Sequence, residues 1–361
     1  MELDLILTFI VDILFVHPNS SKKVYQDLSK DFSAIEPPIW AAMLAKYVVD
    51  RGFSADVLDC EALRISSEQA ASTILELKPK VVCLVAFGQQ PSASTQCMPA
   101  GAKTCHIEAG LRTNNKLSPF PEEINRQITG RISDFHFAPT ETSKNNLLKE
   151  NISNDSILVT GNTVIDALLD SVKKVNKNPS NLINDLNIQI GDKELILITG
   201  HRRENHGKGF DRICKALKKI AEETKDCLII YPVHLNPKVQ EPVNRILSGI
   251  NNIMLIDPLA YKDFIWLMNR AKIIITDSGG VQEEAPSLGK PVLVMRDTTE
   301  RPEAVEAGTV LLVGTNEELI VSKALGLMNN KHDFEKMSKL HNPYGDGKAS
   351  KRIVDFVKKL K

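Results

Sequence analysis

The chain has 361 residues, 42% of them hydrophobic and 25% charged, which is enough for two globular domains of ordinary composition. Its 45 Lys and Arg residues balance its 45 Asp and Glu residues, so no overall positive field favours nucleic acid, and any anion site has to be local. The segment 1–16 is apolar but acidic, which predicts neither a signal peptide nor a membrane span. The six cysteines form no close Cys-x-x-Cys pair, so we expect reduced, buried thiols in a cytoplasmic protein and no zinc site.

Strand-like and helix-like segments alternate along the first half of the chain. Apolar runs predict strands at 12–16, 54–59, 80–87, 103–108, 134–138 and 156–159. Amphipathic runs predict helices at 39–51, 66–77, 122–129 and 141–150. The polar stretch 173–187 is rich in Asn and Lys and contains Pro179, so we expect it to link two domains.

A second alternating series follows this stretch. It predicts strands at 195–199, 227–231, 253–256, 273–276, 291–295 and 310–313. It predicts helices at 209–223, 239–247, 261–269, 281–288 and 316–328. Two such series predict an α/β protein with two Rossmann-like, doubly wound domains. We expect one domain at 1–172, completed by a C-terminal helix at 349–361 that folds back on it, and a second at 188–348. Turns after the strands would line the cleft between them.

The run 277–286 follows the apolar strand 273–276 and opens a helix. Ser278, Gly279 and Gly280 make a small-residue turn at a helix N-terminus, where free N–H groups and the helix dipole favour a phosphate or diphosphate. Glu283 and Glu284 are expected in the first turn of this helix, where they suit the dipole or reach sugar hydroxyls. The alternative is an ordinary capped turn without a ligand.

Two glutamate-containing motifs follow strands of the first half. Glu108 and Arg112 flank a glycine turn in the run 106–113, and Glu122 and Glu123 follow Pro121 at the start of a helix. A first-turn electrostatic role explains one of these helical glutamates. Glu108 and Glu122 lie on loops that face the expected cleft, and paired carboxylates there could act as acid and base.

Basic and aromatic side chains follow strands of the second half. His201 and Arg202 lie on a glycine turn and could bind an anion there. The alternative is a surface turn whose charged side chains are solvated. Further candidates for ligand contact are His234, Phe264, Trp266, Glu300 and Arg301, although His234 and both aromatics also fit structural roles. The sequence contains neither a metal-ligand set nor a Walker lysine, so a nucleotide-sugar fits better than a nucleoside triphosphate.

From about His106 to the C-terminus the chain resembles the non-hydrolysing UDP-N-acetylglucosamine 2-epimerases. The resemblance lies in the motifs at 106–113, 118–126, 137–142, 159–167, 199–205, 277–280 and 296–303. It implies a GT-B architecture, with UDP held mainly by the C-terminal domain, and a cytoplasmic homodimer that needs no cofactor. It also implies interconversion of UDP-N-acetylglucosamine and UDP-N-acetylmannosamine through 2-acetamidoglucal and UDP, to supply envelope polysaccharide synthesis.

The resemblance also assigns roles to residues. Glu108, Glu122 and His201 match catalytic positions of the family. The positions that match UDP-binding residues are Phe264, Ser278, Gly279, Gly280, Glu284 and Arg301. Arg112, Arg202 and His234 are added as substrate-binding candidates from their place in the motifs.

The segment from about 13 to 105 departs from the family. The family motifs Phe-Gly-Thr-Arg-Pro-Glu and His-Gly-Asp-Thr, with their arginine and catalytic aspartate, and a lysine shortly after the first of them, are missing. Residues 15–19, 37–40 and 88–96 instead resemble the cobalamin-binding domain of some radical-SAM enzymes, without an Asp-x-His-x-x-Gly ligand motif. We therefore interpret the chain as a chimera of two family segments, with a junction near 105–106. We expect retained UDP binding and weakened or lost epimerisation.

Three alternatives to the epimerase prediction remain open. The chain could be a catalytically inactive protein that binds a UDP-sugar, a GT-B glycosyltransferase or a cobalamin-binding protein. The Glu-Ala-Gly-Leu-Arg and Pro-Glu-Glu motifs at 108–112 and 121–123 argue against the glycosyltransferase.

Overall fold

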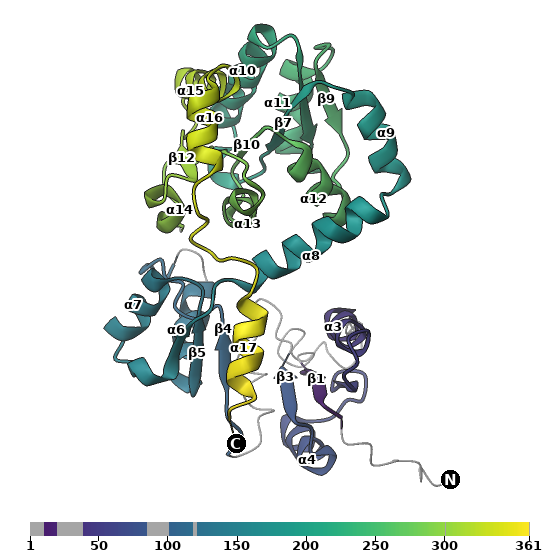
Figure 1. The fold of residues 1–361 in the computed structure, drawn as a ribbon, viewed down its shortest axis with the longest axis vertical. Helices are drawn as coiled ribbons and strands as arrows, with labels where there is room; N and C mark the ends of the chain where they lie inside the picture. The colour runs from purple at the N-terminus through teal and green to yellow at the C-terminus, as the bar shows by residue number, and fades with distance from the viewer. Residues whose placement is uncertain (1–10, 20–38, 85–100, 118–120, 300, 361) are drawn as a thin grey trace. The chain divides into compact units, whose positions relative to one another are not determined.

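The computed structural model describes residues 11–19, 39–84, 101–117, 121–299 and 301–360. The chain divides into two compact units (Figure 1). The smaller unit consists of Met1–His106 and Thr113–Phe135, and the larger unit consists of Ile107–Arg112 and His136–Lys361. No helix among the described residues is both long and apolar enough to cross a membrane.

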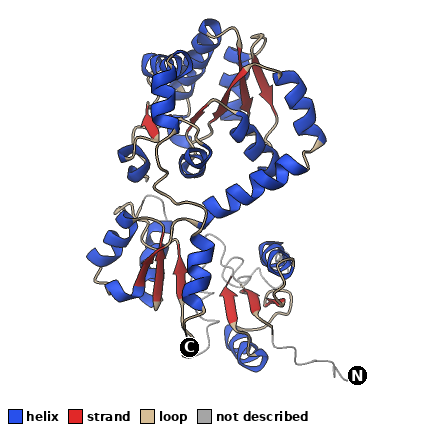
Figure 2. Cartoon of the chain, viewed as in Figure 1, coloured by secondary structure: helices blue, strands red, loops and turns tan. Residues whose placement is uncertain are grey.

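The larger unit is built on a six-stranded parallel sheet (Figure 2). Its strands are β7 (Glu194–Thr199), β8 (Cys227–Pro232), β9 (Ile253–Ile256), β10 (Ile273–Thr276), β11 (Val292–Val294) and β12 (Val310–Leu312). Their order, β12-β11-β10-β7-β8-β9, is that of a doubly wound Rossmann fold. The direction of winding reverses between β7 and β10, and ligands of such sheets bind at this switch point, outside the strand carboxyl ends.

Alternate residues of each strand enter two separate apolar cores, one on each face of the sheet. On β7, Ile196 and Ile198 belong to one core, while Leu195 and Leu197 belong to the other. All four side chains are fully buried. This two-sided burial is why the strands are continuous apolar runs, which made them predictable.

Helices cover both faces of this sheet. The helices of the second half are α10 (Lys208–Glu223), α11 (Pro237–Leu247), α12 (Tyr261–Arg270), α13 (Gly279–Glu284), α14 (Pro302–Glu306), α15 (Glu317–Asn329), α16 (Lys331–Ser338) and α17 (Ala349–Val357). The sequence did not predict α16. Buried residues of α10, α11, α15 and α16 lie in one core, and those of α12, α13 and α14 lie in the other.

Most of the predicted linker at 173–187 is helical. It spans the end of α8 (Thr163–Lys177) and most of α9 (Asn181–Ile190). Within this stretch Ser180 is the N-cap of α9, and its side chain accepts a hydrogen bond from the Ile183 N–H, so this polar side chain begins a helix. Each helix also buries an apolar face, which includes Leu168 on α8 and Leu186 on α9.

Helix α17 packs against segments from the first half of the sequence. The Phe356 ring meets Phe137 edge to face, with 5.4 Å between the ring centroids. The Arg352 guanidinium donates to the Thr160 carbonyl at 2.9 Å. The chain reaches α17 through a close backbone crossing, where a Cβ on Gly161 would lie 3.3 Å from the Gly345 Cα.

The remaining strands form two three-stranded sheets among the described residues. One has the order β2-β1-β3 and consists of β1 (Ile13–His17), β2 (Ala55–Asp59) and β3 (Val81–Leu84), all parallel. Helices α3 (Ile39–Val49) and α4 (Ser67–Leu77) pack on its two faces. The other sheet consists of β4 (Cys105–Ile107), β5 (Phe135–Ala138) and β6 (Ile157–Val159), in that order. Helices α6 (Glu122–Ile132) and α7 (Glu141–Lys149) belong to this region.

The expectation of buried thiols holds only in part. All the cysteines that the structure describes are free, and Cys60, Cys214 and Cys227 are buried. Cys105 is exposed, because β4 presents it outward at the start of a short strand. Cys97 lies outside the described residues.

Candidate functional site

The two central strands of the larger sheet end side by side, and their terminal threonines are joined. The Thr199 and Thr276 hydroxyls are 2.6 Å apart. Directly beyond them, Asp277 Oδ2 accepts hydrogen bonds from the backbone N–H groups of His201 at 2.9 Å and Arg202 at 2.8 Å. The switch point of the sheet therefore carries the glycine turn with His201 and Arg202 on one strand and the small-residue turn on the other.

Asp277 is fully buried and was not predicted as a site residue. Its Oδ1 has no hydrogen-bond partner among the residues that the structure describes, and this oxygen lies 3.8 Å from His201 Nδ1. Asn205 helps to enclose the carboxylate, since its amide nitrogen lies 3.5 Å from Asp277 Oδ2 and donates to the Met295 carbonyl at 3.0 Å. The sequence feature that could have identified Asp277 is its position directly after the apolar strand β10, which ends at the switch point.

The structure brings His201 and His234 together. Their rings stack with 5.1 Å between centroids and 13° between planes. Burial lowers the pKa of His201, Asp277 opposes this effect, and the neighbouring His234, Arg202 and His206 lower the pKa further. His234 Nδ1 accepts a hydrogen bond from the Asn236 N–H at 3.0 Å, so the neutral ring carries its proton on Nε2.

The small-residue turn lies at the N-terminus of α13, as predicted. Ser278 is the N-cap, and its hydroxyl makes no capping bond within the described chain. A Cβ on Gly280 would meet nothing within 4 Å, so a ligand can approach the backbone there. A Cβ on Gly279 would lie 2.9 Å from Arg301 Nη1. Arg301 thus lies against the turn, and a side chain at position 279 would displace its guanidinium.

Glu283 holds Arg301 in this position. Its Oε1 accepts from Arg301 Nε at 2.7 Å, and its Oε2 accepts from the Asn162 amide at 2.9 Å. Burial raises the pKa of Glu283; Arg301 opposes the shift, and Glu108 and Glu284 add to it. Glu108 therefore lies close enough to this ion pair for its charge to raise the pKa of Glu283.

The position of both glutamates within the helix differs from the sequence prediction. Glu283 and Glu284 lie in the last turn of α13, not the first, because the helix begins at Gly279 and ends at Glu284. Glu284 is buried and accepts a hydrogen bond from the Tyr261 hydroxyl at 2.6 Å. Burial raises the pKa of the Glu284 carboxyl, and the bond to Tyr261 opposes that shift.

Phe264 and Trp266 lie on α12, both half-buried against the apolar core on their face of the sheet. Core packing thus accounts for part of each ring. The remaining exposed part of Phe264 is compatible with contact to a ligand.

Glu108 has an unusual backbone. Its φ is 61°, in the left-handed region that a non-glycine residue seldom adopts, and its side chain is exposed. The next two residues fix this conformation: the Ala109 N–H donates to the Phe137 carbonyl at 3.0 Å, and the Gly110 carbonyl accepts from Asn146 at 3.0 Å. Strained residues that the surroundings hold in place concentrate at functional sites.

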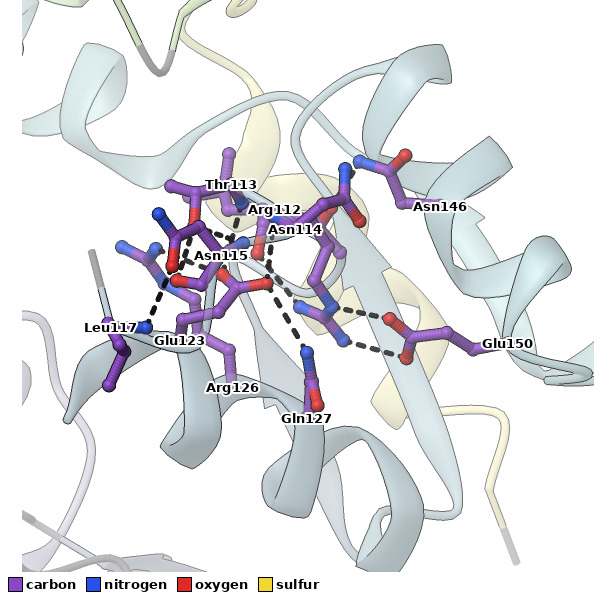
Figure 3. Close-up of polar contacts among 12 residues, drawn as sticks. Arg112, Thr113, Asn114, Asn115, Leu117, Glu123, Arg126, Gln127, Asn146 and Glu150 are labelled. Atoms are coloured by element: carbon purple, nitrogen blue, oxygen red, sulfur yellow. Dashed lines mark hydrogen bonds and ion pairs between the residues drawn. The ribbon is translucent and has the colours of Figure 1, made fainter. Parts of the chain in front are cut away.

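Arg112 is engaged within the protein (Figure 3). Its Nε and Nη2 bind the two carboxylate oxygens of Glu150 at 2.6 and 3.0 Å, and Nη1 donates to the Leu111 carbonyl at 2.8 Å. Only 1% of the Arg112 side chain is exposed. These contacts give Arg112 a structural role, and no ligand contact is needed to explain its burial.

Glu122 and Glu123, in the smaller unit, have different surroundings. Glu123 is fully buried and accepts from the backbone N–H groups of Thr113 at 3.1 Å and Asn114 at 3.2 Å (Figure 3). It therefore holds the loop that precedes its own helix. In Glu122, Oε2 is buried and has no hydrogen-bond partner in the part of the chain that the structure describes. Of Glu122 and Glu123, it is Glu123 that has a structural role, because it binds the backbone of the preceding loop.

Some predicted features lie outside the described residues, namely Glu300 and the segment 88–96. Within the described ranges, no group of three His, Cys, Asp or Glu side chains could hold a metal ion.

A doubly wound sheet with a glycine turn, an arginine and a histidine at its switch point is typical of α/β proteins that bind a phosphate-containing ligand. Residues 68–358 match the family model for UDP-N-acetylglucosamine 2-epimerase, a match that begins well before His106. The chain belongs to the UDP-N-acetylglucosamine 2-epimerase family.

Individual proteins give the same result. A UDP-N-acetylglucosamine 2-epimerase of Escherichia coli K12 is 53% identical over 293 residues, which are 79% of this chain and 77% of that protein. One from Yersinia pestis is 57% identical over 256 residues, 70% of this chain and 68% of that protein. A crystal structure of the Neisseria meningitidis enzyme bound to UDP-GlcNAc superimposes with a TM-score of 0.74 at 38% identity, covering 96% of this chain and 99% of that one. The predicted GT-B-like α/β fold is thereby confirmed.

Proposed function

We propose that this protein interconverts UDP-N-acetylglucosamine and UDP-N-acetylmannosamine. The observation that carries the proposal is the switch-point turn, where α13 and Arg301 offer N–H donors beside His201. Such an arrangement suits the diphosphate of a nucleotide-sugar, and relatives that cover most of this chain are named for this reaction.

The site residues can be given roles in the reaction. The C1–O bond to UDP breaks, the C2 proton is removed by a base, and 2-acetamidoglucal and UDP remain bound. Re-addition delivers a proton to the opposite face of C2 while UDP returns to C1. Glu108 and Glu122 serve as acid and base, and His201 and Arg301 stabilise the diphosphate as negative charge develops on it.

The remaining predicted residues bind the nucleotide. Ser278, Gly279 and Gly280 present backbone N–H groups to the diphosphate, as the open space over Gly280 allows. Glu284, oriented by Tyr261, reaches a ribose hydroxyl, and Phe264 lines the uracil. Arg202 and His234 complete the basic side of the site.

UDP binding should depend on Arg301. Arg301→Ala removes the guanidinium that lies against Gly279, and we expect UDP affinity to fall roughly 10- to 150-fold, since a charge-assisted hydrogen bond contributes about 1.5–3 kcal/mol. Isothermal calorimetry with UDP measures the change. Arg112→Ala is a comparison in which UDP affinity should change little after allowance for any unfolded fraction. No binding of UDP to the wild-type protein at high micromolar concentration would contradict the proposal.

Turnover is expected to be weak, because the arginine, lysine and aspartate of the family's N-terminal motifs are missing from 13–105. Exchange of the C2 proton of UDP-N-acetylglucosamine in heavy water reports partial chemistry even when net epimerisation is slow. We expect measurable exchange with a low rate in a coupled epimerisation assay. A normal epimerisation rate would refute the impairment, whereas UDP binding without C2 exchange would favour an inactive UDP-sugar-binding protein.

The family match reaches back to residue 68, so the predicted junction near 105–106 is wrong, and only the part of 13–105 that precedes residue 68 is proposed to differ from the family's own N-terminal half-domain. Domains at 1–172 (with 349–361) and 188–348 stay a prediction. The parallel order β2-β1-β3 is compatible with either parent fold. The similarity to a cobalamin-binding domain stays a prediction, tested by the visible absorption of protein incubated with cobalamin. A cytoplasmic homodimer is likewise proposed from the family resemblance.

A further inference from the structure

Asp277 is a buried carboxylate whose hydrogen bonds are distributed unequally. Its Oδ2 accepts the backbone N–H groups of His201 and Arg202 at 2.9 and 2.8 Å, with the Asn205 amide at 3.5 Å. Its Oδ1 is buried and accepts nothing from the described residues. A buried carboxylate oxygen without a donor is costly, so this oxygen calls for a partner.

One candidate donor is the His201 ring. His201 Nδ1 lies 3.8 Å from Asp277 Oδ1, which is too long for a hydrogen bond in this ligand-free geometry. Hydrogen bonds between catalytic groups are often long without substrate and tighten when the ligand binds. The backbone of His201 is already fixed by Oδ2 of the same carboxylate, so only the ring has to move.

We propose that Asp277 is a positioning residue that acts through His201. Its Oδ2 fixes the turn at His201, and its Oδ1 accepts the Nδ1–H of the ring when UDP binds. With the ring protonated at both nitrogens, this bond leaves Nε2–H as the donor that meets the departing diphosphate. The inference rests on the proposed function, because it assigns a partner to the histidine of that site.

The charges around His201 explain why a carboxylate is needed there. The titratable and charged groups whose fields act on the ring are Asp277, His234, Arg202 and His206. Burial and the three basic neighbours disfavour the protonated ring, and Asp277 favours it. A histidine that is to stabilise a dianionic leaving group has to present an N–H, and Asp277 supplies the compensating charge.

The first test uses the wild-type protein. Nitrogen-15 NMR of the histidine rings, with His201 assigned through His201→Gln, reports which ring nitrogen carries the proton. In the UDP complex we expect both ring nitrogens of His201 to be protonated, with the Nδ1 proton shifted downfield by its hydrogen bond to a carboxylate. A His201 ring protonated only at Nε2 in the UDP complex overturns the proposal.

The second test is Asp277→Asn. The amide oxygen still accepts from the backbone, but the side chain loses its charge and presents NH₂ to the ring. We expect the His201 pKa to fall, kcat or the rate of C2 exchange to fall about 10- to 100-fold, and the UDP dissociation constant to change less than about threefold. Asp211→Asn, which removes an exposed ion pair with Arg245, is the matched control and should leave all three quantities unchanged.

A double substitution separates action through His201 from a general structural effect. If Asp277 acts through the ring, Asp277→Asn should reduce the rate little further in a His201→Gln background. Full additivity of the two losses, or an unchanged His201 pKa in Asp277→Asn, contradicts the proposal. Absence of turnover in the wild-type protein would count against the proposed function alone, because the ring tautomer and pKa remain measurable.

Discussion

Glu122→Gln is expected to lower the rate of C2 proton exchange about 10²–10⁴-fold, the contribution of a positioned acid or base. The amide keeps the size of the side chain but cannot transfer the proton. Its Oε2 is buried without a hydrogen bond from the described residues, so the substitution removes no hydrogen bond of this oxygen within them. Exchange in heavy water, UDP calorimetry and thermal unfolding measure the three quantities, and UDP affinity and the melting temperature should stay close to wild type.

Glu123→Gln is the matched control, because it makes the same chemical change one residue along. There the amide NH₂ would face one of the two loop N–H groups from which the carboxylate now accepts hydrogen bonds. We expect a loss of about 1–3 kcal/mol in the free energy of unfolding. The assignment is reversed if Glu123→Gln abolishes exchange at unchanged stability while Glu122→Gln only destabilises the protein.

Gly110→Ala is expected to destabilise the protein by about 2–5 kcal/mol, from overpacking and left-handed strain combined. Gly110 has φ of 89°, and a Cβ there would lie 2.1 Å from the Ser143 carbonyl oxygen. The backbone of α7 or the turn after Glu108 has to move, so C2 exchange should fall as well. The midpoint of urea unfolding measures the loss.

Gly326→Ala is the control for this substitution. Gly326 lies inside α15, where a Cβ meets nothing within 4 Å, and alanine is the better helix former. The unfolding midpoint should rise slightly or stay unchanged. A Gly110→Ala protein as stable as wild type would mean that the turn holding Glu108 is more adaptable than its contacts indicate.

The sheet of the larger unit was predictable because its pattern is local. Ile273–Thr276 is apolar throughout, as a strand covered on both faces requires, and its end fixed the position of the Ser278 turn. Helices α8 and α9 were missed because Asn and Lys dominate the stretch 173–187, although the buried Leu168 and Leu186 carry the helical period. Composition outweighed periodicity in that prediction.

Partners distant in sequence explain the rest of what sequence reasoning missed. Glu283 was assigned to a helix dipole or to sugar hydroxyls, but its partners Arg301 and Asn162 lie 18 and 121 residues away. Arg112 was expected to contact substrate, and its carboxylate partner lies 38 residues away. Pairings of this kind depend on topology, and no local motif encodes them.

The neighbouring β7 and β10 join residues far apart in the chain, since the Thr199 and Thr276 hydroxyls are separated by 77 positions. Closing so long a loop costs conformational entropy before any contact compensates for it. During synthesis the His201 turn leaves the ribosome well before Asp277, the carboxylate that fixes it. A nucleotide can therefore stabilise the finished domain by binding to it, but it cannot guide the folding of the strands made before β10.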